Sequence, residues 1–216
     1  MALITADVLK KHFNIWAHFY KAQAGEKEYL MRSEARIIRK GKESAKTDAV
    51  IVMANPGSCS AVDKNAKFEA FPKDGGEKEF VAANPDPTQY QLMNLMERMK
   101  WNCIKIINLS DVCTGNFDEF KKFLKEFRES NNKSHSIFNE KRLKELENHL
   151  ELNPTLIYAW GGEAAIKQFT RVVIEKEKKH KGLLHSERSY YRHPRPAKYA
   201  DRIIWLNEME VHLKEA

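Results

Sequence analysis

Two polar side chains lie at or near the ends of apolar segments, and a third lies in a basic segment. All three are of types that could take part in binding or catalysis. Asn55 directly follows the apolar run 49–54, and Asn108 lies near the end of the run 103–109. His193 lies beside Pro194 in a basic segment. An amide offers an acceptor and two donors in one plane, and a neutral imidazole offers one of each. Such groups suit recognition of a planar polar ligand if the fold brings them together.

Each of these residues also has a simple structural explanation. In Asn55-Pro56-Gly57 the Asn tolerates a left-handed conformation, Pro fixes φ and Gly adopts positive φ, so the triplet is typical of a tight turn. A His-Pro pair in a basic loop is likewise usually structural. The functional interpretation therefore depends on the order and spacing of several motifs.

The C-terminal part carries a basic and aromatic segment. The chain has a net charge of +7, which favours a polyanionic partner, first of all nucleic acid. Cations can bind phosphates while aromatic faces stack on bases, so we expect a DNA-binding surface, although an ordinary exposed basic loop would have the same composition. The residues concerned are Arg188, Arg192, Arg195, Lys198, Tyr199 and Arg202.

Apolar runs and helical periodicity predict an α/β fold in one domain over residues 1–216. Expected strands cover residues 35–39, 49–54, 103–109, 155–160 and 203–206. Expected helices cover 87–100, 118–128, 137–150 and 163–179, together with an N-terminal helix in which Leu9, Phe13, Trp16 and Tyr20 recur at helical spacing. Short apolar strands that alternate with helices predict a three-layer α/β/α arrangement around a mostly parallel sheet of about four strands. Residues 1–48 would form the N-terminal helix and a first strand, and residues 49–206 would form the α/β core that carries the motifs.

In such sheets, ligands bind beyond the carboxyl ends of the strands. Asn55, Asn108 and Gly161 are each expected there. The connection 58–86 is long for a compact domain, which indicates a functional loop.

The order of the motifs resembles the uracil-DNA glycosylase superfamily over most of residues 49–206. Segment 52–58 (V-M-A-N-P-G-S) is similar to its first motif, in the N-P-G form of the mismatch/thymine-DNA glycosylase branch. Pro87-Thr88 resembles the start of the following helix. Segments 106–114, 157–165 and 193–196 resemble the family's base-reading strand end, its W-G turn and its H-P-S-P motif. A bacterial and phage family of unassigned function, with N-P-S-type and R-H-P-type motifs, is similar as well.

The resemblance implies a monofunctional DNA glycosylase that hydrolyses the N-glycosidic bond of a flipped-out pyrimidine. Asn55 would hold the attacking water, although an amide cannot take its proton. Asn108 would pair with the base edge, and a neutral His193 would stabilise charge on the base carbonyl. Asp63 or Asp111 could assist.

Departures from the family pattern bear on the substrate. Gly57 occupies the place where the uracil-specific branch has a Tyr that excludes 5-substituents. We therefore expect a modified or mispaired pyrimidine, such as a bulky 5-substituted base of phage DNA, in repair or anti-phage defence. Phe68 and Phe71 could stack on the base or merely fold their loop onto the core. Lys198 or Tyr199 would replace the usual Leu wedge.

Two other functions remain open: a non-catalytic reader of modified bases, and a nucleoside or nucleotide hydrolase. The three cysteines form no CxxC spacing and the histidines form no metal-binding motif, so neither a metal nor another cofactor is expected. With no secretory signal and no span-length apolar stretch, a cytoplasmic protein is expected. A monomer is expected because no long apolar stripe is left over after the core is assigned.

Overall fold

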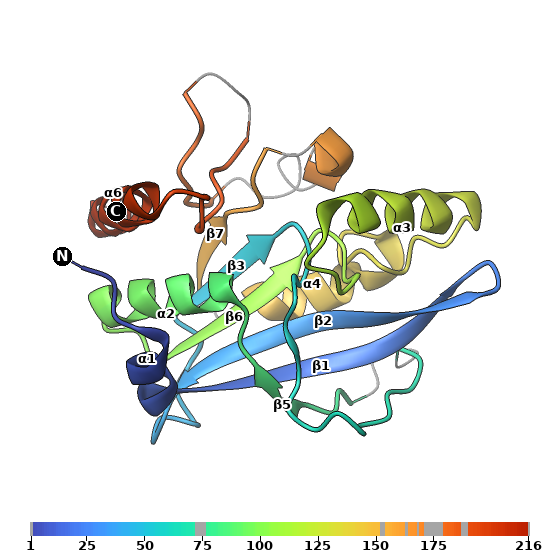
Figure 1. The fold of residues 1–216 in the computed structure, drawn as a ribbon, viewed down its shortest axis with the longest axis horizontal. Coiled ribbons are helices and arrows are strands. Elements are labelled where there is room, and N and C mark those ends of the chain that lie inside the picture. The colour runs from blue at the N-terminus through green and yellow to red at the C-terminus, as the bar shows by residue number, and fades with distance from the viewer. Residues whose placement is uncertain are drawn as a thin grey trace.

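The computed structural model describes residues 2–71, 77–151, 154–162, 164–167, 169–170, 179–186 and 190–215. It confirms an α/β fold, in which a mixed sheet has helices packed on both sides (Figure 1). The sheet has seven strands in the order β4-β5-β1-β2-β6-β3-β7. Their bounds are β1 Phe13–Ala24, β2 Lys27–Arg39, β3 Ala49–Met53, β4 Ser60–Ala61, β5 Val81–Asn84, β6 Cys103–Asn108 and β7 Thr155–Tyr158.

The helices of the described residues are mostly short. They are α1 Ala6–His12, α2 Pro87–Met99, α3 Phe117–Glu129, α4 Leu143–Leu150 and α6 Tyr199–Lys214, with 3-10 turns η2 Glu140–Arg142 and η3 Ala164–Ile166. None of them is long and apolar enough to cross a membrane.

The parallel part of the sheet is the part that the apolar runs predicted. β3 lies between β6 and β7 and pairs in parallel with both. Its five residues are all buried, as expected for a strand covered on both faces. Beyond β7, Lys181 forms a single parallel bridge with Ile157. The carboxyl ends of these strands therefore meet at one edge of the sheet.

The expected mostly parallel sheet of about four strands is wrong for the other half of the sheet, which is antiparallel. β1 and β2 form a long hairpin that joins β6 through antiparallel pairing. Ala24 pairs with Lys27 around a two-residue turn whose first residue, Gly25, has φ of 62°. Glycine at that position is what a tight hairpin turn requires. The predicted N-terminal helix therefore ends at His12, and Phe13, Trp16 and Tyr20 lie in β1.

A β-bulge in the hairpin determines which way two buried charges point. His18 pairs with Glu34 and Phe19 pairs with Arg32, which leaves Ser33 as an extra residue in β2. In an uninterrupted strand, residues 32 and 34 would share a face. Here Arg32 donates to the carbonyl of Pro56, whereas Glu34 lines a cavity on the side of α4.

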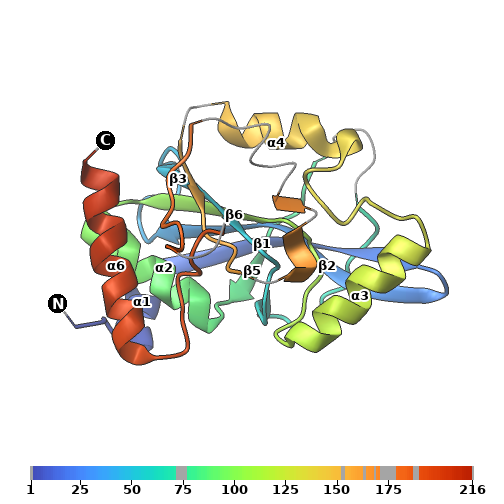
Figure 2. The ribbon, with the colours of Figure 1, turned by 90° about the horizontal axis from the view of Figure 1, so that it is seen from above.

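Two hydrophobic clusters hold the helices to the sheet. Leu9 of α1, Leu92 of α2 and Trp205 of α6 belong to one cluster. Phe120 of α3 belongs to the other, and Leu146 of α4 packs against it. Figure 2 shows α4 and α2 on opposite sides of the sheet.

The predicted strand at residues 203–206 is also wrong, because these residues lie within α6. Trp205, Leu206 and Met209 are fully buried and follow helical spacing, while Ile204 is exposed. Four apolar residues in a row do not distinguish a strand from a buried helix face.

Two further predicted helices are shorter or only partly described. The predicted helix 137–150 is confirmed only over η2 and α4. Of the predicted helix 163–179, the structure describes η3 and a few helical residues up to Thr170, and much of the remainder lies outside the described residues.

Candidate functional site

Asn55 and Asn108 lie at the same edge of the sheet. Met53, the last residue of β3, is the parallel partner of Asn108, the last residue of β6. The loops beyond both strands stay together, since Ser110 N donates to the carbonyl of Ala54 at 3.1 Å. Asn55, Gly57, Asp86, Asn108, His193 and Arg32 are called the strand-end cluster below.

The Asn55 amide is fixed by the chain that follows β6. Its Nδ2 donates to the carbonyl of Thr114 at 2.7 Å and to that of Val112 at 3.4 Å. These two bonds orient the amide and leave Oδ1 as an acceptor without a hydrogen bond to the described residues. The side chain can therefore accept a hydrogen bond from a water or a ligand.

The Asn108 side chain is completely buried. Neither its Oδ1 nor its Nδ2 has a hydrogen-bond partner among the described residues. An unpaired buried polar group costs about 1–3 kcal/mol, so native proteins keep few of them without a reason. A base can pair with this amide only after the surrounding side chains move apart.

Gly57 lies against the carboxylate of Asp86. Its φ is 66°, and a Cβ at this position would be 2.6 Å from Oδ2 of Asp86. The absence of a side chain at residue 57 therefore does not leave open space for a 5-substituent, because Asp86 fills it. The sequence-based reason for expecting a bulky base, an empty position at Gly57, therefore does not hold.

Asp86 is the N-cap of α2, and only one of its oxygens is used for capping. Oδ1 accepts from both Thr88 N and Gln89 N at 2.8 Å, and Gln89 Oε1 accepts in return from Asp86 N. Oδ2 has no hydrogen bond to the described residues, although the residue is 8% exposed. The cluster therefore contains a carboxylate oxygen with free acceptor capacity, on a residue that is mostly buried.

His193 lies close to the same carboxylate. A Cβ on Gly161, just beyond β7, would be 3.5 Å from the Cβ of His193. Burial lowers the pKa of His193, although the Arg195 backbone and the Asp86 carboxylate oppose this shift. Nδ1 lies 3.1 Å from Arg195 N, from which it can accept, and 3.3 Å from the Arg195 carbonyl, to which it can donate. The shorter contact favours the tautomer with the proton on Nε2. A neutral ring with a donor at Nε2 is what stabilisation of a developing oxyanion requires.

Arg32 adds a positive charge to the strand-end cluster, and it was not among the predicted site residues. Its side chain is 2% exposed, and Nη1 donates to the carbonyl of Pro56 at 3.2 Å. The Asp86 carboxylate interacts electrostatically with it, and Nε has no partner among the described residues. The Arg32 guanidinium thus holds the Asn55-Pro56-Gly57 turn through its hydrogen bond to the Pro56 carbonyl.

Phe68 and Phe71 pack against the hairpin. The ring of Phe68 lies 5.3 Å from that of Phe19, and the ring of Phe71 lies 4.8 Å from that of Tyr20. Both line the cavity on the α4 side, whose lining includes none of Asn55, Asn108 and His193. The structure does not bring them together with the strand-end cluster.

The two carboxylates expected to assist are also placed elsewhere. Asp111 is fully buried on the α4 side, where Arg142 and Tyr20 donate to its Oδ2. Asp63 is exposed and accepts from Asn65 N. The carboxylate that lies in the cluster is Asp86.

The expected DNA-binding segment precedes and enters α6. Lys198 and Tyr199 are exposed and Arg195 is partly exposed. Arg202 instead donates to the carbonyls of Pro196 and Ala197, and Arg192 is paired with Glu208. Arg188 lies outside the described residues.

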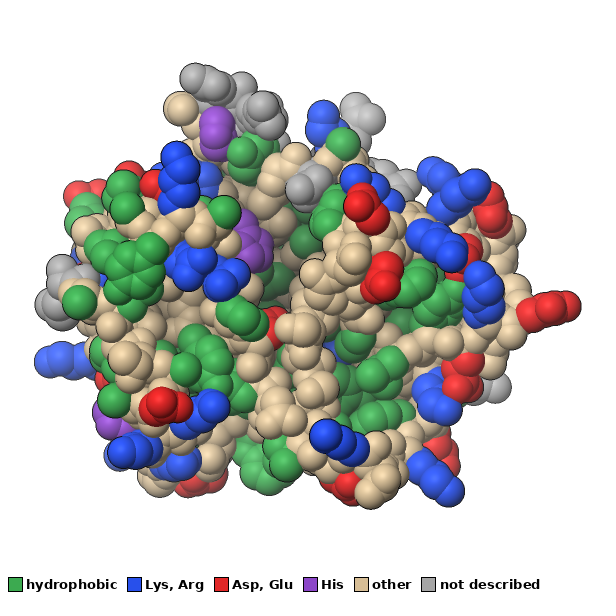
Figure 3. Space-filling view, viewed as in Figure 1, with side chains coloured by type: hydrophobic (Ala, Val, Ile, Leu, Met, Phe, Trp, Pro, Cys, Tyr) green, Lys and Arg blue, Asp and Glu red, His purple; other side chains and the backbone are tan. Residues whose placement is uncertain are grey.

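Figure 3 shows Lys and Arg side chains over this part of the molecule, beside a hollow in the face. Lys198 and Tyr199 are therefore available to a ligand, whereas Arg192 and Arg202 already have partners in the fold.

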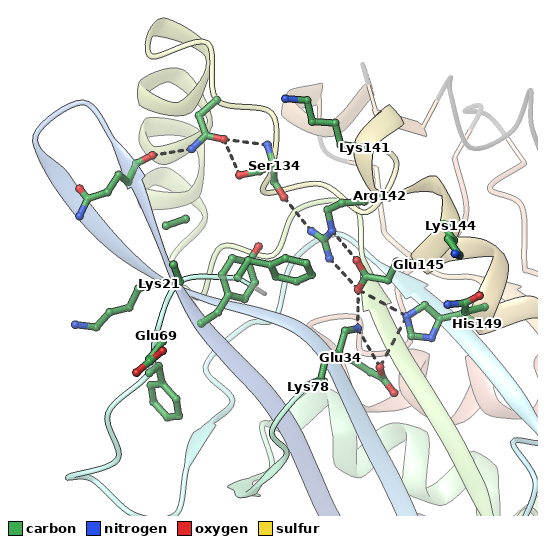
Figure 4. A pocket seen from close by; sticks show the side chains of 18 of the residues that line it. Lys21, Glu34, Glu69, Lys78, Ser134, Lys141, Arg142, Lys144, Glu145 and His149 are labelled. Atoms are coloured by element: carbon green, nitrogen blue, oxygen red, sulfur yellow. Dashed lines mark hydrogen bonds and ion pairs between the residues drawn. The ribbon is translucent and has the colours of Figure 1, made fainter. Parts of the chain in front are cut away.

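The α4-side cavity is a second polar region. It has a volume of about 1280 Å³ and lies between the hairpin, the segment 68–71 and the chain from η2 into α4 (Figure 4). Its wall includes Glu34, Lys78 and Glu145, and Lys78 Nζ lies 2.6 Å from Glu145 and 3.4 Å from Glu34.

Arg142 joins this network to Asp111. It donates to Glu145 through Nε and Nη2 and to Asp111 Oδ2 at 2.5 Å. Burial alone would raise the pKa of Glu145, but Arg142 and Lys78 outweigh it and lower this pKa to about 2. The charges of the network therefore stabilise one another at neutral pH.

His149 lies in the same wall and is 6% exposed. Its Nε2 is 3.8 Å from Glu34 and 4.0 Å from Glu145, too far for hydrogen bonds, and neither ring nitrogen has a hydrogen-bond partner among the described residues. Burial lowers its pKa to about 4, so the ring is neutral near pH 7. It offers one donor and one acceptor.

Sequence reasoning missed Asp86 and Arg32. An Asp-Pro pair ahead of a helix, with Gln three residues later, is a capping signal that could have placed Asp86 at a helix N-terminus. Its proximity to Gly57 depends on how α2 packs and has no local signal. Among the described residues, no group of three or more His, Cys, Asp or Glu side chains could hold a metal ion.

Comparisons with protein-family models, with curated proteins and with solved structures found no match to this chain.

Proposed function

We propose that the chain is a DNA glycosylase that hydrolyses the N-glycosidic bond of a flipped-out modified or mispaired pyrimidine. The observation that carries the proposal is the Asn108 amide, which is buried at a strand end and makes no side-chain hydrogen bond to any residue that the structure describes. A planar donor and acceptor pair of this kind matches the edge of a pyrimidine. The energetic cost of leaving it unpaired is recovered when a base binds.

The other residues of the strand-end cluster fit the requirements of this reaction. Breaking the bond produces an oxocarbenium-like sugar and an anionic base. The Nε2–H of a neutral His193 can donate to the base oxygen on which charge develops. Asn55, held through its Nδ2, presents Oδ1 to orient a water.

Asp86 supplies the proton acceptor that the amide of Asn55 cannot provide. Water attacks C1′ of the sugar while the bond from C1′ to the base breaks, and the bonding electron pair leaves with the base. The proton of the water passes to Oδ2 of Asp86, whose negative charge also stabilises the positively charged sugar. The departing base takes up a proton from solvent.

The exposed start of α6 is proposed to bind duplex DNA. Lys198 and Tyr199 lie a few residues beyond His193, where a cation can bind phosphate and an aromatic ring can fill the vacated stack. Because Asn108 is closed to solvent, binding of DNA at this surface must be accompanied by opening of the cluster.

An assay of base release tests the proposal. The protein is incubated with single-stranded and duplex DNA that carries different modified or mispaired pyrimidines. Free base is measured by mass spectrometry and abasic sites by alkaline cleavage. We expect release from at least one substrate, and its loss in the Asn55→Ala, Asn108→Ala and His193→Ala variants. Binding without release would indicate a non-catalytic reader, and activity only on free nucleosides or nucleotides would indicate a nucleoside hydrolase.

A further inference from the structure

The α4-side cavity has polar capacity that the fold itself does not use. No residue of the strand-end cluster lines it, and the glycosylase reaction proposed above does not involve it. Its volume of about 1280 Å³ exceeds that of many small-molecule sites, which are commonly about 300–1,000 Å³. A cavity of this size can hold more than a simple anion.

The charges that line the cavity favour an anionic occupant. Seven Lys or Arg side chains face four Glu side chains. Lys21, Arg36, Lys78 and Arg142 are each paired with a Glu of the same wall. Lys105, Lys141 and Lys144 have no ion pair with any described residue, against one unpaired carboxylate, Glu69. Positive charge is therefore left over.

The unpaired cations come from different elements. Lys105 lies in β6, Lys141 in η2 and Lys144 in α4. Figure 4 shows Lys141 and Lys144 on the side of η2 and α4, across the cavity from Lys21 and Glu69. Phosphate groups bind such clusters of flexible ammonium groups.

His149 provides the second, independent sign of a ligand. Its ring is more than nine-tenths buried, lines the cavity and makes no hydrogen bond to the described residues. Lys78 already bridges Glu34 and Glu145. The imidazole is therefore not needed to hold the network together. Its ring nitrogens are buried, and they can bind a polar group in the cavity once the neighbouring side chains move aside.

Aromatic side chains form the remaining wall. Phe68 and Phe71 are partly buried and lie with Tyr20 along the hairpin side. Rings of this kind provide apolar surface for a flat heterocycle. The cavity thus combines spare cations, a neutral donor and acceptor, and an aromatic wall.

We propose that the α4-side cavity binds a nucleoside phosphate, with its phosphate on the wall that carries the unpaired lysines of η2 and α4 and its base between His149 and the aromatic wall. The ligand is either a free nucleotide or the 5′-phosphorylated end of a nucleic-acid strand.

Isothermal titration calorimetry on the full chain tests the proposal. The probes are inorganic phosphate, thymidine, a set of nucleoside mono- and triphosphates, and a 5′-phosphorylated hexanucleotide. We expect at least one nucleotide to bind at least about tenfold more tightly than phosphate or thymidine. Preference for the hexanucleotide would identify a strand end as the ligand, and preference for a mononucleotide would identify a free nucleotide. No binding at millimolar concentration, or equal affinity for phosphate alone, would overturn the proposal.

Variants locate the bound ligand. Lys141→Glu with Lys144→Glu should weaken binding at least about tenfold. The matched control is Lys121→Glu with Lys125→Glu on α3, which makes the same charge change at exposed lysines outside the cavity and should leave affinity unchanged. An equal loss in both double variants would show a general charge effect and refute the site.

His149→Leu tests the buried ring separately. It removes both ring nitrogens while keeping a side chain of similar size in the wall. We expect at least about tenfold weaker nucleotide binding, with a free energy of unfolding that is unchanged or higher because an unpaired polar group is lost. Unchanged binding in a stable His149→Leu protein would contradict the assignment of His149.

Discussion

The two polar regions of the molecule differ in how far the fold satisfies their side chains. On the α4 side, Arg142, Lys78, Glu34 and Glu145 pair mainly with one another, whereas the neutral His149 and three lysines have no such partner among the described residues. In the strand-end cluster, the Asn108 amide and Oδ2 of Asp86 lack partners among the described residues. Side chains whose charges pair with one another stabilise the fold, whereas side chains with unused donors and acceptors are available to a ligand. The α4 side contains both kinds, and the strand-end cluster contains mainly the second.

The largest effect on stability is expected from breaking the α4-side network. Arg142→Met would leave Asp111 and Glu145 without their main partner, and removal of one member of a buried ion pair costs about 3–5 kcal/mol. Urea denaturation measures the free energy of unfolding. Arg128→Met on α3 is the control, because this exposed residue should change stability by less than about 0.5 kcal/mol. Similar losses of unfolding free energy in the two variants would contradict the view that the α4-side ion pairs stabilise the fold.

Asp86→Asn should instead affect activity. The new amide retains Oδ1 to cap α2 but replaces Oδ2 by a donor, so base release should fall about 10²-fold or more. Base release is measured under single-turnover conditions on a substrate found by the base-release assay.

Asp48→Asn is the matched control for this variant. Its carboxylate also accepts from two backbone N–H groups, at the amino end of β6, the opposite end of that strand from Asn108. Base release in this variant should be normal. Full activity in the Asp86→Asn protein would remove Asp86 from the mechanism and leave the roles of Asn108 and His193 to be tested on their own.

Acidification should lower the free energy of unfolding, because buried histidines on the α4 side resist protonation in the folded state. Burial lowers the pKa of His18, His135 and His149 to about 4. Between pH 6.5 and pH 4 the unfolded chain therefore binds protons that the folded chain does not, and stability decreases as the pH decreases. Each histidine should contribute a loss of about 1–2 kcal/mol between pH 7 and pH 5.

Urea denaturation at both pH values checks this dependence. The His149→Leu variant should lose one such contribution and show a smaller decrease. An identical decrease in the two proteins would mean that His149 can take up a proton in the folded state.

The smallest stability effect is expected for Asn108→Leu. This change removes an unpaired buried amide and keeps the side-chain volume similar, so the free energy of unfolding should stay the same or rise by about 1 kcal/mol. Base release should be abolished in the same protein. A large destabilisation would mean that the amide supports the fold, and the contrast between the two regions would fail.

Continuous apolar runs were the most informative part of the sequence. β3, β6 and β7 lie within a residue or two of their predicted bounds, because strands covered on both faces need uninterrupted apolar residues. The hairpin was missed because Phe13, Trp16 and Tyr20 happen to fit helical spacing. The strand predicted at residues 203–206 was wrong because helix α6 buries two adjacent apolar residues, Trp205 and Leu206.

The candidate site was predictable where it depends on strand ends. Asn55 and Asn108 follow directly from the apolar runs that precede them, and the pairing of Met53 with Asn108 places them at one edge. Asp86 and Arg32 reach this edge through the packing of α2 and through a bulge in β2. Neither of these depends on a short-range pattern, so single-sequence reasoning could not find them.

The extra residue in β2 has a consequence for how this chain can diverge. Loss of Ser33 would make Arg32 and Glu34 direct neighbours in a regular strand, where they would still point to opposite faces, so both polar regions would keep their charges. A deletion elsewhere in β2 would instead reverse the faces of the residues on one side of it. Descendants that retain both regions should therefore tolerate substitution or loss at position 33 but conserve the length of the rest of β2.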